Sequence, residues 1–214
     1  MRVKSKKTFL KVVAIVWAAS GIVILAGVIV PILSYQVRSD TETPQLISPV
    51  GPDSTKASNW FPGGATSDVF QKSTVSYYTI SIPKLKIENA VVAIGGEDLA
   101  KSLIQYPGTA LPGKNGNAVI FGHSILPIFY NPKNYISIFS TLPTLKKDEE
   151  IYIDYDSVSY TYKVEDAFEV LPTDIQVLQQ DTSDSFLTLV TCVPPGDPRR
   201  PKRWIVRARV VPLE

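Results

Sequence analysis

Cysteine and histidine, which build many catalytic and metal-binding sites, are nearly absent from this sequence. The 214 residues include one cysteine, Cys192, and one histidine, His123. A single cysteine excludes an internal disulfide framework, and it leaves too few thiolates for the usual four-ligand structural zinc site. Any reaction that needs both a thiol and an imidazole from this chain must therefore use Cys192 and His123.

A large excess of charge of one sign is also absent, because the net charge is only +2. That value is too small to indicate nucleic-acid binding on its own. The basic residues are nevertheless unevenly distributed. One cluster lies in the first eleven residues, which contain no acid, and a second lies between residues 199 and 209. Two separate clusters indicate two separate roles.

The N-terminal sequence indicates a membrane anchor. Residues 12–33 carry no charge, and a helix of that length would span roughly 33 Å, close to the ~30 Å hydrocarbon core of a bilayer. We expect a single-pass transmembrane helix at the cell membrane, with the basic tail, residues 1–11, in the cytoplasm and the rest of the chain outside. The alternative is a cleaved signal peptide, but its apolar region usually has only about 7–15 residues.

The segment after this run, residues 34–76, is rich in Ser, Thr, Pro, Gly and Asp. This composition predicts a flexible extracellular spacer with a low propensity to fold. Trp60 and Phe61 interrupt it. The sequence leaves open whether these two aromatic residues dock on the following domain or are merely exposed.

Residues 77–214 have the pattern of one mainly β domain. Alternating or continuous apolar segments predict short strands at residues 79–82, 90–94, 117–122, 151–155, 158–164, 186–191 and 204–211. Asp156 and Ser157 give a hairpin signal between two of them. Residues 97–106 predict a short helix that ends before Pro107. Seven or eight short strands with one or two helices are typical of a β-barrel or a β-sandwich.

Three predicted strand ends carry reactive side chains. His123 follows residues 117–122, Cys192 ends the apolar strand before Pro194, and Arg203 opens the last strand. A thiolate is a nucleophile whose pKa a nearby cation lowers, and a histidine can protonate a leaving amine. An arginine can hold a carbonyl or stabilise an oxyanion. Together they indicate acyl transfer through a thioester.

Simpler interpretations of the same residues remain open. A lone cysteine on a strand is more often an inert core side chain than a nucleophile. The histidine after Gly122 is compatible with an ordinary turn residue, and the arginines with a solvated face or a phosphate-binding patch. The loop between Cys192 and Arg203 contains four prolines. Such a stiff connection suits a rigid wall beside a site.

Four segments resemble the sortases, the membrane-anchored cysteine transpeptidases of bacterial surfaces: LTLVTC, NAVIFGHS, YTISIPKLKIENAVV and GTALPGKNGNAVIFGHS. The resemblance covers about residues 77–211. It implies a closed, eight-stranded β-barrel in which His123 is the catalytic histidine, Cys192 the nucleophile and Arg203 the arginine that steadies the substrate and the intermediate. It also implies that Thr191 lines the substrate groove. The resemblance assigns no role to the pair Arg199 and Arg200.

The reaction that this resemblance implies has two halves. Cys192 attacks the Thr–Gly bond of a Leu-Pro-any-Thr-Gly sorting signal near the C-terminus of a secreted protein. An amine from a cell-wall precursor or another surface protein then resolves the thioester, with His123 as acid and then as base. No cofactor and no nucleic-acid partner are expected. Some sortases bind calcium at acidic loops, and residues 148–150, Asp181 and Asp184 are available here, but acidic turns are usually only solvated.

Two other functions use the same domain. The first is a membrane-tethered binding domain on a sortase-like barrel that performs no chemistry. The second is a thiol protease, a hydrolase in which water resolves the thioester. We expect an enzyme to have a partly exposed Cys192 with His123 and Arg203 close by. Burial of Cys192 in apolar packing, with the histidine pointing elsewhere, would favour the binding domain.

Overall fold

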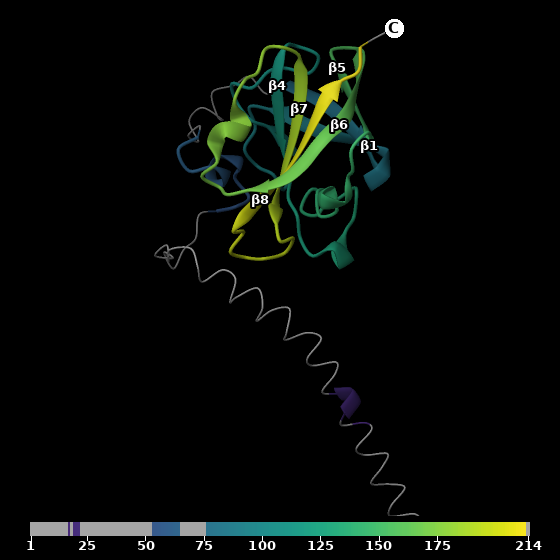
Figure 1. Cartoon of the computed structure of the whole chain (residues 1–214), viewed down its shortest axis with the longest axis vertical. Helices are drawn as coiled ribbons and strands as arrows, with labels where there is room; N and C mark the ends of the chain where they lie inside the picture. Colours follow the sequence, from purple (N-terminus) through teal and green to yellow (C-terminus); the bar gives the residue numbers. More distant parts are fainter. Residues whose placement is uncertain (1–16, 18, 22–52, 65–75, 213–214) are drawn as a thin grey trace, which may run out of the picture. The chain divides into compact units, whose positions relative to one another are not determined.

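The computed structural model describes residues 17, 19–21, 53–64 and 76–212. The chain divides into two units, Met1–Gly51 and Pro52–Glu214, and the second contains the β domain (Figure 1). Residues 17 and 19–21 are helical. In the described part of the chain, no helix combines the length and the hydropathy of a membrane span. The predicted cytoplasmic tail, 1–11, and most of the predicted transmembrane helix, 12–33, lie outside the described residues.

Eight strands of the described residues close into a barrel in the order β1-β2-β3-β4-β7-β8-β6-β5 (Figure 1). This confirms the mainly β, closed eight-stranded barrel expected for the domain. The strands are β1 (Ser76–Ile82), β2 (Ile87–Ile94), β3 (Leu103–Gln105), β4 (Gly116–Phe121), β5 (Glu150–Tyr155), β6 (Val158–Val170), β7 (Ser185–Val193) and β8 (Lys202–Val210). Short 3₁₀ helices lie in the connections: η1 (Ala57–Trp60), η2 (Pro83–Leu85), η3 (Pro127–Phe129), η4 (Leu142–Thr144) and η5 (Ile175–Leu178).

The hairpin between β5 and β6 forms where the sequence predicted it. Tyr155 pairs with Val158, and the two turn residues, Asp156 and Ser157, have φ values of 52° and 64°. A two-residue turn with both residues in the left-handed region matches the right-handed twist of the flanking strands. The turn therefore fixes the register of this pair.

The helix predicted over residues 97–106 does not form. Leu103–Gln105 instead make β3, which pairs parallel to β2 and antiparallel to β4 and is buried throughout. Before β3, the Leu99 N–H donates to the Thr55 carbonyl, and the Ala100 N–H donates to the Asp98 carboxylate. The first of these hydrogen bonds is tertiary and the second is a local turn contact, and neither belongs to the ladder of a helix. Residues 103–105 extend instead, because β3 joins β2 to β4 in the closed barrel.

Strand β7 is buried along its whole length because both of its faces are covered. Leu187 and Leu189 belong to the cluster inside the barrel. Val190 and Cys192 face the other way, into a second cluster with Phe121 of β4. The same second cluster contains three residues that precede the first strand in the sequence: Ala57, Trp60 and Phe61. The outer face of β4 and β7 is thus packed against a segment that precedes the barrel in the sequence.

Residues 53–64 are packed on the domain, although they lie within the segment expected to be a flexible spacer. The Ala57 N–H donates to the Glu97 carbonyl, and the Trp60 indole N–H donates to the Ser54 carbonyl. Trp60 and Phe61 are only 1% and 2% exposed. The question left open by the sequence is therefore settled in favour of docking. We call residues 53–64 the covering segment.

Candidate active site

The strand register brings His123, Cys192 and Arg203 to one end of the barrel. Parallel strands β4 and β7 pair Phe121 with Val190, and the Gly122 N–H continues this ladder to the Val190 carbonyl at 3.1 Å. The same register, advanced by two residues, sets His123 beside Cys192. Antiparallel strands β7 and β8 pair Cys192 directly with Arg203. Residues opposite each other in neighbouring strands project from the same face of the sheet.

Gly122, just before the histidine, occupies a position with no space for a side chain. A Cβ atom there would lie 2.4 Å from Phe139 Cδ2 and 2.6 Å from Leu103 Cδ2. The close approach lets the His123 carbonyl accept a hydrogen bond from the Phe139 N–H at 2.9 Å. Glycine therefore allows the end of β4 to lie against the connection that follows it, which orients the histidine backbone.

Two hydroxyl groups tie the ends of β4 and β7 together. The Thr191 hydroxyl donates to the Gly122 carbonyl at 2.8 Å, and the Ser124 hydroxyl donates to the Cys192 carbonyl at 2.6 Å. Thr191 is completely buried, so here its side chain bonds to the neighbouring strand end, and its contact with a substrate stays a prediction. The sequence analysis did not single out Ser124, although it directly follows the histidine.

The covering segment lies over all three predicted catalytic residues. The Trp60 and His123 rings have centroids 5.8 Å apart. The Trp60 carbonyl accepts two hydrogen bonds from Arg203, from Nη2 at 2.8 Å and from Nε at 3.2 Å. The guanidinium also lies 5.5 Å and 6.0 Å from the ring centres of Trp60 and Phe61. The Trp60 carbonyl thus occupies the guanidinium fork of Arg203, that is, the N–H groups of Nε and Nη2. These are the donors with which Arg203 would hold a substrate carbonyl.

The expectation that Cys192 is partly exposed is wrong for this structure. Cys192 is 4% exposed, and His123 and Arg203 are buried to a similar degree. The physical reason is the apolar cluster around Cys192, which contains Trp60 and Phe61. The sequence had left the docking of these two aromatic residues open. The criterion for a non-catalytic domain was a buried thiol together with a histidine that points elsewhere. The thiol is buried, but the His123 imidazole and the Arg203 guanidinium lie in the same covered region.

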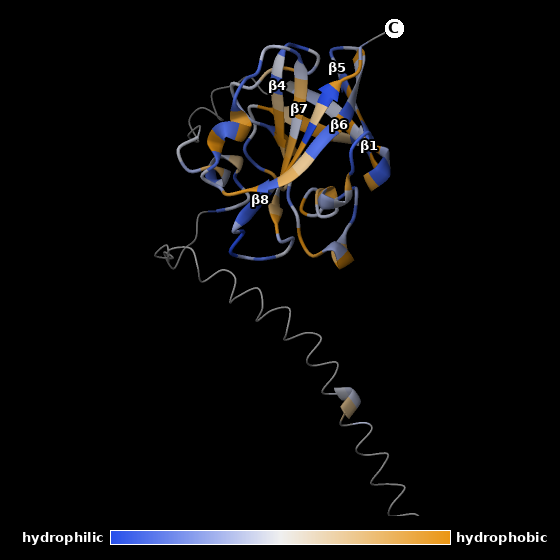
Figure 2. Cartoon of the chain, viewed as in Figure 1, coloured by the Kyte–Doolittle hydropathy of each residue, from blue (hydrophilic) through white to orange (hydrophobic). Residues whose placement is uncertain are grey.

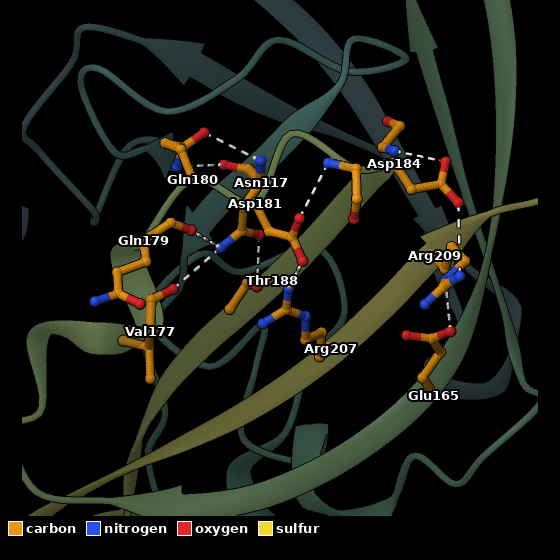
Figure 3. Close-up of polar contacts among 12 residues, drawn as sticks. Asn117, Glu165, Val177, Gln179, Gln180, Asp181, Asp184, Thr188, Arg207 and Arg209 are labelled. Carbon is orange, nitrogen blue, oxygen red and sulfur yellow. Dashed lines mark hydrogen bonds and ion pairs between the residues drawn. The ribbon is translucent and has the colours of Figure 1, made fainter.

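The structure separates Arg203 from the two later arginines of β8. Arg207 lies 3.9 Å from the Asp181 carboxylate. Figure 3 shows Arg209 in contact with the carboxylates of Glu165 and Asp184. The distances are 2.7 Å to Glu165 and 3.7 Å to Asp184. Both guanidinium groups lie over the Phe186 ring at the opposite end of β7. Of these three arginines, Arg203 is the one paired with the cysteine.

A side-chain network holds the connection between β6 and β7 against β4 (Figure 3). The buried Asn117 amide donates to the Val177 carbonyl at 3.1 Å and accepts from the Thr188 hydroxyl at 2.7 Å. The Gln180 side chain accepts from the Asn117 N–H at 3.0 Å and donates to its carbonyl at 3.0 Å. These contacts fix η5, whose Val177 and Leu178 pack against the cluster that contains Cys192. The connection therefore forms one wall of the site.

Burial sets the protonation of the covered site. The pKa of His123 falls from 6.5 to about 4, mainly because of burial and also because of the charge of Arg200, while the charges of Asp98 and Asp53 oppose the shift. Burial also raises the pKa of the Cys192 thiol, against the charges of Arg203 and Arg200. A buried group is least stable in its charged form. At neutral pH the covered site therefore holds a neutral thiol and a neutral imidazole.

The lone histidine allows this protonation state to be measured directly. A proton NMR titration of the His123 ring is expected to give a pKa of about 4, below the ordinary 6.5. Trp60→Ala should raise that pKa, because water then reaches the ring and stabilises the imidazolium. A pKa near 6.5 in the unmodified protein would show that the ring is hydrated and that the covering segment does not shield it.

Carboxylates of the acidic loops considered for calcium have cationic partners. Glu149 lies 3.0 Å from the Lys84 ammonium, and Glu150 lies 3.7 Å from that of Lys163. Asp181 and Asp184 face the arginines of β8. Within residues 53–64 and 76–212, no three His, Cys, Asp or Glu side chains are grouped so that they would hold a metal ion.

Comparisons with known proteins agree on one family. The family model described as "Sortase domain" matches residues 80–211. The chain is 27% identical to "Sortase A" of Streptococcus agalactiae over 132 residues, which are 61% of this chain and 51% of that protein. It is 30% identical to "Sortase A" of Bacillus anthracis over 135 residues, 62% of this chain and 58% of that protein. The chain thus spans little more than half the length of these relatives. A solved Sortase D5 transpeptidase of Clostridium perfringens is 28% identical, with a TM-score of 0.54 over 64% of this chain and 79% of that one.

Proposed function

Since the chain belongs to the sortase family, we propose that it is a cysteine transpeptidase. Its substrates would be secreted proteins with a C-terminal sorting signal of the Leu-Pro-any-Thr-Gly type, which it would transfer to an amine on the cell surface. The observation that carries the proposal is the strand register. It pairs Cys192 with Arg203 and, extended by two residues, sets His123 beside Cys192.

In the first half of the reaction, the Cys192 sulfur attacks the threonine carbonyl carbon of the Thr–Gly bond. The carbonyl oxygen becomes an oxyanion, which the Arg203 fork stabilises from the position where it now binds the Trp60 carbonyl. The intermediate collapses as the C–N bond breaks and His123 protonates the departing glycine amine. A thioester between Cys192 and the threonine remains.

In the second half, an amine from a cell-wall precursor or another surface protein attacks the thioester carbon. His123 takes a proton from this amine and the C–S bond breaks, which restores the thiolate and the imidazolium. If water attacks instead, the same residues give hydrolysis, which is the activity of a thiol protease. The nature of the nucleophile in this step therefore decides between transfer and hydrolysis.

The covering segment has to move before the peptide binds, because Trp60 occupies the Arg203 fork. Its departure would admit water to the thiol and the imidazole. Hydration lowers the pKa of Cys192 and raises the pKa of His123, which are the reverse of the two shifts that burial causes. Both changes favour the thiolate–imidazolium pair that the attack requires.

A non-catalytic binding domain is the second candidate, and the burial of Cys192 favours it. One experiment separates the candidates. The protein is incubated with a library of sorting-signal pentapeptides and a set of amines, and mass spectrometry identifies every product. A transpeptidase gives a thioester on Cys192 and new peptide–amine products. Peptide binding without a thioester and without peptide–amine products would support the binding domain and contradict our proposal.

The proposed location is the cell membrane, with a single span, a cytoplasmic N-terminus and the catalytic domain outside. The uncharged run at residues 12–33 and the basic residues before it support this topology. Proteolysis of intact cells that express the protein tests it. We expect an external protease to release the barrel, whereas protection of the barrel would contradict this orientation.

Arg203→Lys tests the guanidinium fork. The ammonium keeps the charge but cannot donate two parallel hydrogen bonds, so thioester formation should slow by about 30-fold, equivalent to about 2 kcal/mol. The same change removes a hydrogen bond to Trp60, so alkylation of Cys192 should become faster. Single-turnover acylation and alkylation with iodoacetamide measure the two effects. Near-normal acylation would assign the fork's role to another residue.

A further inference from the structure

The adjacent residues Arg199 and Arg200 have different environments in the connection between β7 and β8, which is largely hydrophilic in Figure 2. Arg199 is exposed, and its Nη2 lies 2.9 Å from the Asp197 carboxylate. Arg200 is half-buried, and its Nη1 is fully buried with no hydrogen-bond partner among the described residues. A buried donor without a partner costs about 1–3 kcal/mol. The orphaned Arg200 nitrogen therefore needs a physical explanation.

The backbone of Arg200 is tied to the catalytic arginine. Arg200 has a φ of 47°, in the left-handed region that non-glycine residues rarely adopt. Its N–H donates to the Asp197 carbonyl at 3.1 Å, and its own carbonyl accepts a hydrogen bond from Arg203 Nη1 at 2.9 Å. The turn that gives Arg200 this conformation thus also holds Arg203. Such strain is typical of positions whose geometry serves a site.

The positive charge of Arg200 affects the pKa values of all three predicted catalytic residues. It lowers the pKa of His123, where Asp98 and Asp53 act in the opposite direction. It also lowers the pKa of the Cys192 thiol, as Arg203 does. Burial lowers the pKa of Arg203, Cys192 opposes this shift, and the charge of Arg200 adds to it. A cation that acts on these three groups lies beside the site.

We propose that Arg200 is a second active-site arginine, whose buried Nη1 donates a hydrogen bond to a carbonyl oxygen of the bound peptide. This inference rests on the proposed function. In the covered structure the carbonyl of Trp60 occupies Arg203 and leaves Arg200 Nη1 without an acceptor. His123 Nε2 is also buried and has no hydrogen-bond partner in the part of the chain that the structure describes. Two orphaned nitrogens suit a ligand that brings more than one oxygen, as an extended peptide does.

Arg200→Gln and Arg200→Lys test the proposal, with Arg199→Gln as the matched control from the neighbouring position. Arg200→Gln should slow thioester formation about tenfold. Loss of the positive charge should also raise the pKa of His123 and the pKa of Cys192, because the imidazolium is less repelled and the thiolate less stabilised. Arg200→Lys should keep both pKa values near those of the unmodified protein while acylation stays slow. Arg199→Gln should change neither acylation nor the two pKa values.

NMR of the lone histidine and the pH dependence of Cys192 alkylation provide the two pKa values without any peptide. Thermal unfolding shows whether each variant is folded, and Arg200→Lys carries the acylation test if Arg200→Gln is not. Acylation and pKa values of Arg200→Gln that equal those of Arg199→Gln would overturn the proposal, as would unimpaired acylation by Arg200→Lys. An unmodified protein that forms no thioester would contradict the proposed function. The peptide-contact inference would then fail with it, while the two pKa shifts would still show whether Arg200 acts on the site.

Discussion

Cys192→Ala is expected to abolish every covalent adduct between the protein and a sorting-signal peptide. No other cysteine exists in the chain, so no second thiol can form the thioester. The measurement is the intact mass of the protein after incubation with peptide, which should show no added acyl group. Peptide–amine products should disappear as well, because both halves of the proposed reaction pass through the sulfur.

The fold of this variant serves as its control. Cys192 is buried, and replacement by alanine removes only one sulfur atom, so we expect a small loss of about 1 kcal/mol in the free energy of unfolding. Thermal unfolding and the NMR signal of His123 should therefore remain close to those of the unmodified protein. A folded Cys192→Ala protein that still forms an acyl adduct would reject Cys192 as the nucleophile.

Trp60→Ala is expected to raise the alkylation rate of Cys192 by roughly 100-fold or more. Loss of a buried tryptophan side chain costs a packed state at least about 3 kcal/mol, and a change of that size in the opening equilibrium is roughly 150-fold in rate. The exposed thiol should also have a lower pKa, because burial is the main cause of its rise. The alkylation rate with iodoacetamide, measured as a function of pH, reports both changes.

Tyr77→Ala is the matched control for this experiment, because Tyr77 is an aromatic residue of β1 that is 64% exposed. Its alkylation rate should equal that of the unmodified protein. Urea unfolding of Trp60→Ala separates local opening from global loss of structure. An unchanged alkylation rate in folded Trp60→Ala would show that the thiol is shielded by the barrel itself and that the covering segment plays no part.

The parts of the fold that depend on local pattern were predictable from the sequence. Apolar strands around β4 and β7, and the turn at Asp156 and Ser157, follow from periodicity and turn chemistry. The placement of His123 and Cys192 at strand ends was also correct. Their side-by-side position depends on parallel pairing of β4 with β7, which the sequence analysis did not predict.

The parts that were missed depend on contacts between distant residues. Strand β3 has three residues, and its conformation is decided by the neighbours β2 and β4 rather than by its own propensity. Docking of Trp60 involves a hydrogen bond to Arg203, 143 residues away. A Ser- and Pro-rich context predicts a tether, and the two aromatic residues that interrupt it, Trp60 and Phe61, left their docking open. The different surroundings of Arg199 and Arg200 likewise arise only once the loop is folded.

The assembly of the site from distant segments has a consequence for folding. Trp60 belongs to the covering segment, His123 follows β4, Cys192 lies in β7 and Arg203 lies in the last strand, β8. Chains whose contacts are mainly non-local fold slowly, because loop entropy is lost before those contacts form. During synthesis the thiol emerges before its arginine partner does. In refolding, resistance of Cys192 to a pulse of alkylating reagent should therefore be among the last native properties to appear.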